Sequence, residues 1–252
     1  LWEHGADVTM VQRSPTLVVK SDSVVRLAIG RLYSEEALKA GITTERADFL
    51  AASMPFKEQP KLQIPLYERI RAQDAEFYRR LEGAGFMLHF GEDNSGLSAM
   101  YMRRGSGYYI DVGASDLVAD GRIRLKSRTD VLAIDSNGVV LSDGSHLPAD
   151  LIVHATGYGP MNNWAERLIS PDVAAKVGQC WGLGSGTRGD PGPWEGELRN
   201  MWKPTRQDAL WFHGGNLAQS RIYSHYLALQ LKARLENIDL VVDGDPTVAG
   251  RH

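Results

Sequence analysis

The chain has 252 residues, of which 43% are hydrophobic and 23% charged, proportions typical of a globular protein with a buried core. Its net charge of −3 gives no basic footprint for nucleic acid, and its single cysteine, Cys180, excludes an internal disulfide, a Cys-x-x-Cys redox pair and a cysteine-rich zinc site. No apolar run is long enough to span a bilayer and no signal peptide is visible, so we expect no membrane association and a cytoplasmic location.

The first strand is expected near the beginning of the chain. Residues 1–4 read as the end of a helix and are followed by Gly5. A helix needs an N-terminal cap and a first turn, and neither stands here, so we expect that an upstream part is missing. The β-branched run 8–12 then predicts a strand of a parallel sheet, which residues 13–15 end.

The next hundred residues have a mostly helical pattern. The clearest helix spans residues 66–81, is charged on one face and ends before Gly83. The glycine- and serine-rich stretch 91–107 predicts a surface loop. Three prolines are expected to break the helical region of 23–132: Pro55, Pro60 and Pro65.

A change of period marks the region from residue 122 onward. Residues 122–126 alternate polar and apolar side chains, and residues 131–134 form a short apolar run that we also expect to be a strand. Asx-Gly pairs at 137–138 and 143–144 are typical of tight hairpin turns. These features predict a small antiparallel meander.

The meander leads into an apolar run that begins after Asp150. The run is too short for a helix and is bounded by Pro148 and Gly157, so it predicts a buried strand. Thr156 and Gly157 would let the backbone turn tightly and approach a ligand. A core strand that ends in an ordinary turn explains the pattern equally well.

The last part of the chain is irregular and then helical. Residues 159–211 are rich in Gly and Pro and hold five of the six tryptophans. An apolar stripe then predicts a helix that runs to about residue 237, followed by a frayed tail. The stripe consists of Ile222, Tyr226, Leu229 and Ala233.

Arg13 ends the first predicted strand, where a doubly wound nucleotide-binding domain meets the adenosine ribose of its ligand. An acid at this point holds the 2′-hydroxyl of NAD, whereas an arginine accommodates the 2′-phosphate of NADP. Arg13 and Ser14 would offer that phosphate a guanidinium and a hydroxyl. The alternative is a solvated arginine at the end of a strand.

A glycine turn precedes the final helix. The turn contains Gly214, Gly215 and Asn216, and glycines allow a planar ring to approach the backbone. The helix N-terminus offers N–H groups and partial positive charge, which suits the electron-rich edge of a flavin. The alternative is an ordinary turn capped by Asn216 or Ser220.

Other motifs carry less chemistry. Residues 184–189 match G-x-G-x-x-G, but the Asp-Pro-Gly-Pro that follows cannot open a helix, so we expect no dinucleotide binding there. His213 and His225 lack a nearby acidic partner and are expected to be packing or surface residues, with no metal site. No Gly-x-Ser-x-Gly elbow supplies a hydrolase nucleophile. Three aspartates read as turn and cap residues: Asp111, Asp116 and Asp120.

Several segments together resemble the C-terminal half of bacterial and fungal flavin-containing monooxygenase-like proteins. The run from 150 to 158 resembles the "ATG" hinge of flavin-dependent oxidoreductases with two dinucleotide-binding domains. The resemblance covers most of the chain. Its other segments are 104–119 (RGSGYYIDVGASDLVA), 184–205 (GSGTRGDPGPWEGELRNMWKPT) and 212–235 (FHGGNLAQSRIYSHYLALQLKARL).

Members of that family use FAD and NADPH, so the resemblance implies transfer of one oxygen atom from O2 to a small-molecule substrate. No protein acid or base stands out as catalytic. Both glycine fingerprints, for FAD and for NADPH, are absent, so we expect this chain alone to bind either cofactor weakly or not at all. The implied cofactor-binding residues are Arg13, Ser14, Thr156, Gly157, Tyr158, Gly215, Asn216, Gln219 and Ser220.

The implied fold is α/β, a partial Rossmann-like flavoprotein with two dinucleotide-binding domains, a helical insertion and an antiparallel β-meander. Residues 1–155 would be the remainder of the NADPH-binding domain, and 156–252 the returning part of the FAD-binding domain. Two alternatives stay open: a flavin-dependent NADPH reductase that does not oxygenate, and an inactive fragment or interaction module. The identity of the substrate and self-association into a homo-oligomer are also left open.

Overall fold

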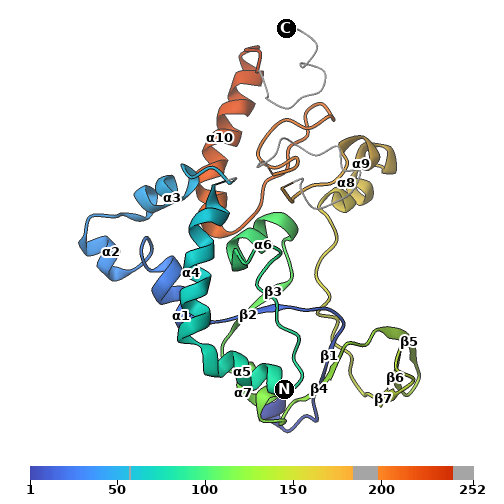
Figure 1. Cartoon of the computed structure of the whole chain (residues 1–252). Helices are drawn as coiled ribbons and strands as arrows, with labels where there is room; N and C mark the ends of the chain where they lie inside the picture. The colour runs from blue at the N-terminus through green and yellow to red at the C-terminus, as the bar shows by residue number, and fades with distance from the viewer. Residues whose placement is uncertain (57, 184–197, 241–252) are drawn as a thin grey trace. The chain divides into compact units, whose positions relative to one another are not determined.

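The chain combines helices and short strands, which come in runs along the sequence (Figure 1). The computed structural model describes residues 1–56, 58–183 and 198–240. Its mixture of helices and small sheets agrees with the coarse expectation of an α/β protein. Within those ranges, no helix has both the length and the apolar character that crossing a membrane requires.

The chain forms two compact units, each built from separate stretches of sequence. Unit 1 comprises Leu1–Ala28, Gln63–Leu97 and Gly107–Gly157. Unit 2 comprises Ile29–Leu62, Ser98–Ser106 and Tyr158–His252. The expected assignment of cofactors to the ranges 1–155 and 156–252 stays a prediction.

Two pairs of parallel strands lie in unit 1. β1 (Thr9–Gln12) pairs with β4 (Arg124–Ser127), and β2 (Leu17–Lys20) pairs with β3 (Tyr108–Asp111). The prediction of a parallel strand at 8–12 is confirmed. The assignment of 122–126 to the antiparallel meander is wrong, because β4 hydrogen-bonds to a strand far away in the sequence, and such long-range pairing leaves no local signal.

The core of unit 1 begins at β2. Leu17, Val18 and Val19 are fully buried, as expected for a parallel strand covered on both faces. Each such side chain contributes about 1.5–3 kcal/mol relative to an exposed one. Other large side chains that are almost completely buried in this unit are Tyr67, Ile70, Leu81, Val118 and Leu141.

The helix expected at 66–81 is in fact two helices, α4 (Gln59–Gln73) and α5 (Ala75–Gly83). Asp74 separates them, and its buried carboxylate accepts a hydrogen bond of 2.5 Å from Ser23 Oγ. Pro65 lies inside α4, where a break was expected. The other helical elements that lie wholly or mostly in unit 1 are η1 (Trp2–His4), α1 (Ser21–Val24), η2 (Val25–Ile29) and α7 (Ala114–Ala119).

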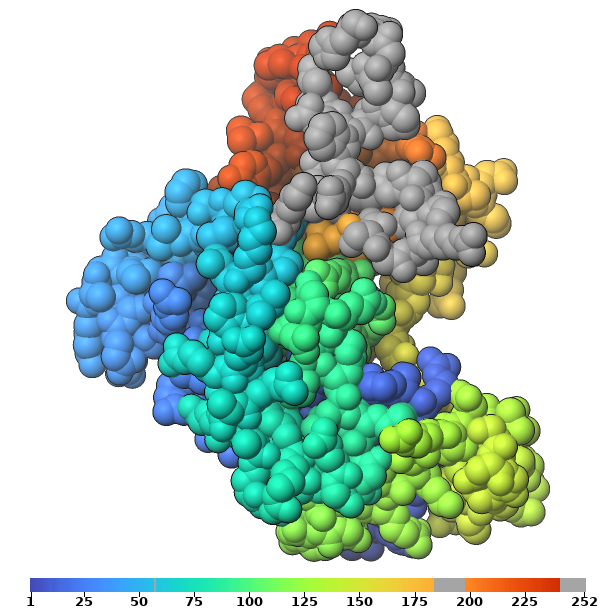
Figure 2. All heavy atoms as spheres, viewed as in Figure 1, coloured from blue at the N-terminus to red at the C-terminus, as the bar shows by residue number. Residues whose placement is uncertain are grey.

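The antiparallel meander is confirmed. β5 (Val131–Asp135), β6 (Gly138–Leu141) and β7 (His146–Pro148) form a three-stranded sheet in that order. The two predicted Asx-Gly turns connect them, with φ of +153° at Gly138 and +81° at Gly144. Figure 2 shows the meander residues at the surface of this unit, in yellow-green.

The apolar run after Asp150 is not the buried strand that the sequence predicts. Residues 151–155 form no strand, and Leu151 and Val153 are 72% and 67% exposed. A strand is stabilised by backbone hydrogen bonds to a neighbour, and none of the strands in the described residues pairs with this run. Gly157 does adopt the positive φ, +91°, that a tight turn needs.

Unit 2 is largely helical. The stretch 91–107, expected to be a surface loop, contains α6 (Gly96–Arg104), because its methionines and alanine enter cores: Met100, Met102 and Ala99 are each 4% exposed. A loop pattern of Gly and Ser therefore concealed an amphipathic helix. The other helices of this unit are α2 (Glu35–Lys39), α3 (Thr44–Ala52), α8 (Asn162–Leu168), α9 (Pro171–Val177) and α10 (Leu217–Leu235).

The core of unit 2 gathers the side chains of α6, α8 and α9 with those of the segments that follow. Residues 184–197, which hold the G-x-G-x-x-G match, and the tail 241–252 lie outside the described residues. The buried residues of this core are Met102, Ala165, Ala174, Val177, Cys180, Leu183, Leu198, Met201, Trp202 and Phe212.

The turn between β5 and β6 offers a test of the fold. A Cβ at Gly138 would lie 2.0 Å from the Leu147 carbonyl oxygen, whereas one at Gly144 would meet nothing within 4 Å. Because a backbone atom cannot move aside alone, we expect Gly138→Ala to cost about 3 kcal/mol or more. Gly144→Ala, the matched control, should cost only the left-handed strain of about 1–2 kcal/mol. Urea denaturation of both variants checks this, and equal losses would contradict the register.

Candidate functional site at the amino end of helix α10

Helix α10 begins at the glycine turn that the sequence singles out. Asn216 accepts the backbone N–H of Gln219 on its side-chain oxygen at 2.9 Å, and Gln219 Oε1 accepts the N–H of Asn216 at 3.3 Å. This reciprocal arrangement is a capping box. The Ser220 hydroxyl donates to the Gly214 carbonyl at 3.1 Å. The cap by Asn216 agrees with the alternative interpretation, an ordinary capped turn, while Ser220 ties the turn together from inside the helix.

Gly215 holds a position that only glycine fits. Its φ is +90°, and a Cβ there would lie 2.6 Å from Gln219 Oε1 and 3.2 Å from Trp202 Cζ2. The sequence predicts that the glycine lets a planar ring approach the backbone. The ring that approaches in the structure is the indole of Trp202.

An aromatic cluster surrounds this turn. Trp202 stacks on Tyr223 of α10, with ring centroids 4.3 Å apart and planes inclined by 20°. Trp181 packs edge-on against both Trp202, at 6.1 Å, and Tyr101, at 5.0 Å. The Tyr101 hydroxyl donates to Gln219 Oε1 at 2.9 Å. Aromatic packing and the capping box therefore share one residue, Gln219.

The Trp202 indole Nε1 is a buried donor with no hydrogen-bond acceptor among the described residues. The side chain is only 6% exposed, and Cζ2, the ring atom nearest to Gly215, is bonded to the carbon that carries Nε1. A buried polar group without a partner costs about 1–3 kcal/mol, so such groups call for an explanation. Here the donor lies at the turn that begins α10.

A buried carboxylate anchors α10 near its amino end. Asp48 of α3 is 4% exposed and accepts hydrogen bonds from Arg221 Nε at 2.7 Å and Nη2 at 2.9 Å. The Tyr33 hydroxyl donates to the same carboxylate at 2.8 Å. The Arg221 hydrogen bond holds the pKa of Asp48 below its usual range. Burial, with the hydrogen bond to Asp48, raises the pKa of Tyr33 to about 12.

Arg13 and Ser14 lie in unit 1, directly after β1, and both are exposed. Gln12, the last residue of β1, is buried and pairs with the backbone of Met87, donating to its carbonyl at 3.0 Å and accepting its N–H at 2.9 Å. Arg13 Nε lies 3.8 Å from an Asp130 carboxylate oxygen. The strand end is thus held firmly, while the guanidinium stays accessible.

The predicted site residues fall into two sets. Unit 2 brings Gly215, Asn216, Gln219 and Ser220 together on one turn, and it also contains Tyr158, whose side chain is fully exposed. Unit 1 contains the other four. Among the described residues, no hydrogen bond or ion pair joins the pair after β1 to the pair at 156–157.

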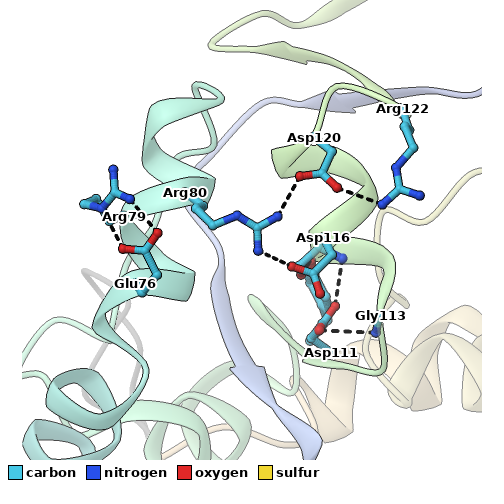
Figure 3. A network of polar contacts seen from close by, with 10 residues as sticks. Glu76, Arg79, Arg80, Asp111, Gly113, Asp116, Asp120 and Arg122 are labelled. Carbon is cyan, nitrogen blue, oxygen red and sulfur yellow. Dashed lines mark hydrogen bonds and ion pairs between the residues drawn. The ribbon is translucent and has the colours of Figure 1, made fainter.

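A polar network in unit 1 links α5 to α7 (Figure 3). Arg80 donates to Asp116 at 2.6 Å and to Asp120 at 2.7 Å, and Arg122 donates to the other oxygen of Asp120 at 2.7 Å. The two arginines hold the pKa of Asp120 below its usual range. Arg80 therefore connects two helices, where the sequence indicates only a solvated helix face.

The three aspartates that were expected to be turn and cap residues differ in what their carboxylates bind. Asp111 is one, since its carboxylate accepts the N–H groups of Gly113 at 3.2 Å and Ser115 at 2.8 Å. Asp120 is the C-cap residue of α7 and also pairs with Arg80, whereas Asp116 lies in the first turn of α7 and pairs with Arg80. The two histidines, His213 and His225, are exposed as expected. The described residues contain no cluster of three or more side chains of the kinds that bind metals.

Sequence reasoning missed the residues that contact the turn from elsewhere in the chain. Asp48, Tyr101 and Trp202 come from three separate segments, and nothing in their local sequence distinguishes them from ordinary core or surface residues. The only signal was the unusual density of tryptophan in 159–211. No protein-family model matches the chain, and no curated protein matches it significantly.

The Asp48–Arg221 ion pair predicts a pH-dependent stability. Because the pKa of Asp48 is lowered in the folded state, the pair stabilises the fold above the unfolded pKa of about 3.9, and this stability is lost as the pH falls through the folded pKa. Arg221 is half exposed, so we expect Asp48→Asn to cost about 2 kcal/mol at neutral pH.

The measurement is urea denaturation of both proteins from neutral pH down to pH 3. The stability difference between wild type and Asp48→Asn should shrink toward the acid end. Glu45→Gln, on the exposed part of the same helix, is the control and should stay within about 0.5 kcal/mol of wild type. A difference that does not change with pH would show that Asp48 acts through shape alone.

Proposed function

We propose that this chain forms part of an FAD- and NADPH-dependent monooxygenase that transfers one oxygen atom from O2 to a small organic substrate. The observation that carries the proposal is the amino end of α10. There a glycine turn and a helix N-terminus meet a buried indole N–H that finds no acceptor in the part of the chain that the structure describes. The resemblance of the surrounding sequence to flavin-containing monooxygenase-like proteins supports the same assignment.

These groups fit the edge of a flavin. A flavin presents carbonyl oxygens along its pyrimidine ring, and the ring becomes more electron-rich on reduction. The capping box occupies the N–H groups of Asn216 and Gln219, which leaves those of Leu217 and Ala218 to the positive end of the helix dipole. Trp202 Nε1 would add a further donor for an acceptor oxygen.

The exposed pair at the end of β1 fits the other cofactor. Arg13 and Ser14 would hold the 2′-phosphate of NADPH, with the guanidinium released from its long, exposed contact with Asp130. FAD and NADPH supply the hydride transfer and the activation of oxygen when they are bound. The role of the chain is then to orient the rings and to exclude water around them.

The role of Arg13 can be tested by comparing NADPH with NADH. In the complete monooxygenase of which we propose this chain forms part, we expect Arg13→Ala to weaken NADPH binding about tenfold, the loss typical of one hydrogen-bonded charged group, and to leave NADH binding nearly unchanged. Nicotinamide fluorescence measures both affinities. Arg69→Ala, on an exposed part of α4, is the control and should change neither. Equal losses for the two nucleotides would count against the assigned role.

The reaction itself is tested with FAD, NADPH, isotopically labelled O2 and a panel of small organic substrates. Incorporation of labelled oxygen into one of them supports the monooxygenase, whereas NADPH oxidation without incorporation favours the reductase. We expect the purified chain to be colourless, because it has no glycine fingerprint in a context that binds a pyrophosphate. If the complete protein of which this chain forms part binds neither cofactor at saturating concentration and oxidises no NADPH, an interaction module is favoured.

A further inference from the structure

The carboxyl ends of β1 and β4 lie side by side in unit 1 (Figure 1). The two strands run parallel, so the segments 13–16 and 127–130 leave the pair at the same edge. The backbone N–H of Arg128 donates to the Gln12 carbonyl at 2.9 Å. With ordinary bond lengths, this hydrogen bond brings the Cα atoms of Arg13 and Arg128 within about 7 Å of each other. Two arginines are therefore neighbours at the point where the two strands end.

Arg128 has a left-handed backbone conformation, with φ of +59°. Residues other than glycine seldom adopt this conformation, and asparagine and aspartate do so more readily than arginine. The turn after β4 therefore gives no reason of its own for an arginine at this position. Backbone strain of this kind is concentrated at binding and catalytic sites, where the side chain has a use that outweighs it.

The charges of the two segments do not cancel. They carry two guanidiniums, those of Arg13 and Arg128, against one carboxylate, that of Asp130. The contact between Arg13 and Asp130 is long, at 3.8 Å, and both side chains are largely exposed. Arg128 is also exposed, and within the described ranges its side chain makes no hydrogen bond or ion pair. The next charged pair along β4, Lys126 with Asp143 at 4.0 Å, is neutral as a whole. An anion at this edge would therefore meet a net positive charge.

We propose that Arg128 is a second residue that binds the 2′-phosphate of NADPH, and that it helps to determine the preference for NADPH over NADH. The inference rests on the proposed function, in which Arg13 binds the same phosphate. A phosphate monoester carries about two negative charges at neutral pH and offers three acceptor oxygens, so it can bind guanidiniums from two strand ends at once. NADH has a hydroxyl group in place of this phosphate and gains little from either arginine.

The test measures the affinities of NADPH and NADH in the complete protein of which this chain forms part. Arg128→Asn removes the guanidinium and keeps a residue that tolerates the left-handed conformation, so the fold is expected to remain. Because the group is exposed, we expect NADPH to bind about three- to tenfold more weakly and NADH to bind unchanged. Arg128→Lys keeps the positive charge and should recover part of the loss. The matched control is Arg124→Asn, at the amino end of β4 and about 13 Å away along the strand, which should change neither affinity.

Smaller probes separate this inference from the proposed function. Ligand-observed NMR compares 2′-AMP with 5′-AMP and with inorganic phosphate, and we expect Arg13→Ala and Arg128→Asn each to weaken only 2′-AMP. Weaker binding of 2′-AMP to both variants of a protein that oxygenates no substrate would support the arginine pair and count against the monooxygenase.

Three results would overturn the inference. The first is an Arg128→Asn variant that keeps the preference for NADPH while Arg13→Ala loses it, which would leave the proposed function standing. The second is an Arg128→Asn variant that loses NADH as much as NADPH, because the arginine would then contact a part that both nucleotides share. The third is an unchanged affinity of Arg128→Asn for 2′-AMP.

Discussion

The burial of one carboxylate, Asp48, constrains the helical unit more than any other single group. An ionised carboxylate removed from water costs several kcal/mol unless hydrogen bonds and a counter-charge compensate it. Arg221 supplies two such bonds and Tyr33 supplies one. Tyr33 precedes Asp48 by 15 residues, and Arg221 follows it by 173 residues. This compensation attaches α3 to α10 near its amino end, and so it helps to set where the glycine turn and its capping box lie.

Two tryptophans of the aromatic cluster beside that turn have unusual backbone conformations. Trp181 and Trp202 have φ of +72° and +57°, values that residues other than glycine seldom adopt. A backbone hydrogen bond fixes each of them. The N–H of Trp181 donates to the Arg199 carbonyl at 2.9 Å, and the N–H of Trp202 donates to the Phe212 carbonyl at 2.9 Å. Strain of this kind persists only where the surroundings impose it, and it is concentrated at binding and catalytic sites. Several contacts therefore fix the positions of the rings in the aromatic cluster.

Unit 1 is constrained by a different problem, the edges of its sheets. Each parallel pair has only two strands, and every residue of β5 is exposed, including Leu132 at 67%. Strand edges and apolar strand faces are usually paired or covered in native proteins. The exposed run at 151–153 has the same composition as a sheet strand without the ladder that would make it one. The shape of unit 1 is thus set by a few buried residues of β2 and by side-chain links such as Gln12 to Met87, more than by extended sheets.

Local chemistry explains what the sequence by itself determined. The Asx-Gly pairs at 137–138 and 143–144 predict their hairpins because few residues other than Gly tolerate the backbone angles of those turns. Asn216, with Gln219 three residues later, carries the capping of α10 within one helical turn. The β-branched run at 8–12 similarly predicts its own strand. In each case the residues that decide the structure are neighbours in the chain.

Tertiary structure alone decided the rest. A break at Asp74 depends on Ser23, the parallel partner of β1 is a strand more than a hundred residues away, and the apolar run after Asp150 lacks the neighbour that would make it a strand. The groups that surround the glycine turn, Asp48, Tyr101 and Trp202, were hidden for the same reason. Hydrogen bonds and ring contacts between distant segments carry no periodicity or local propensity, so only the folded chain shows which residues meet.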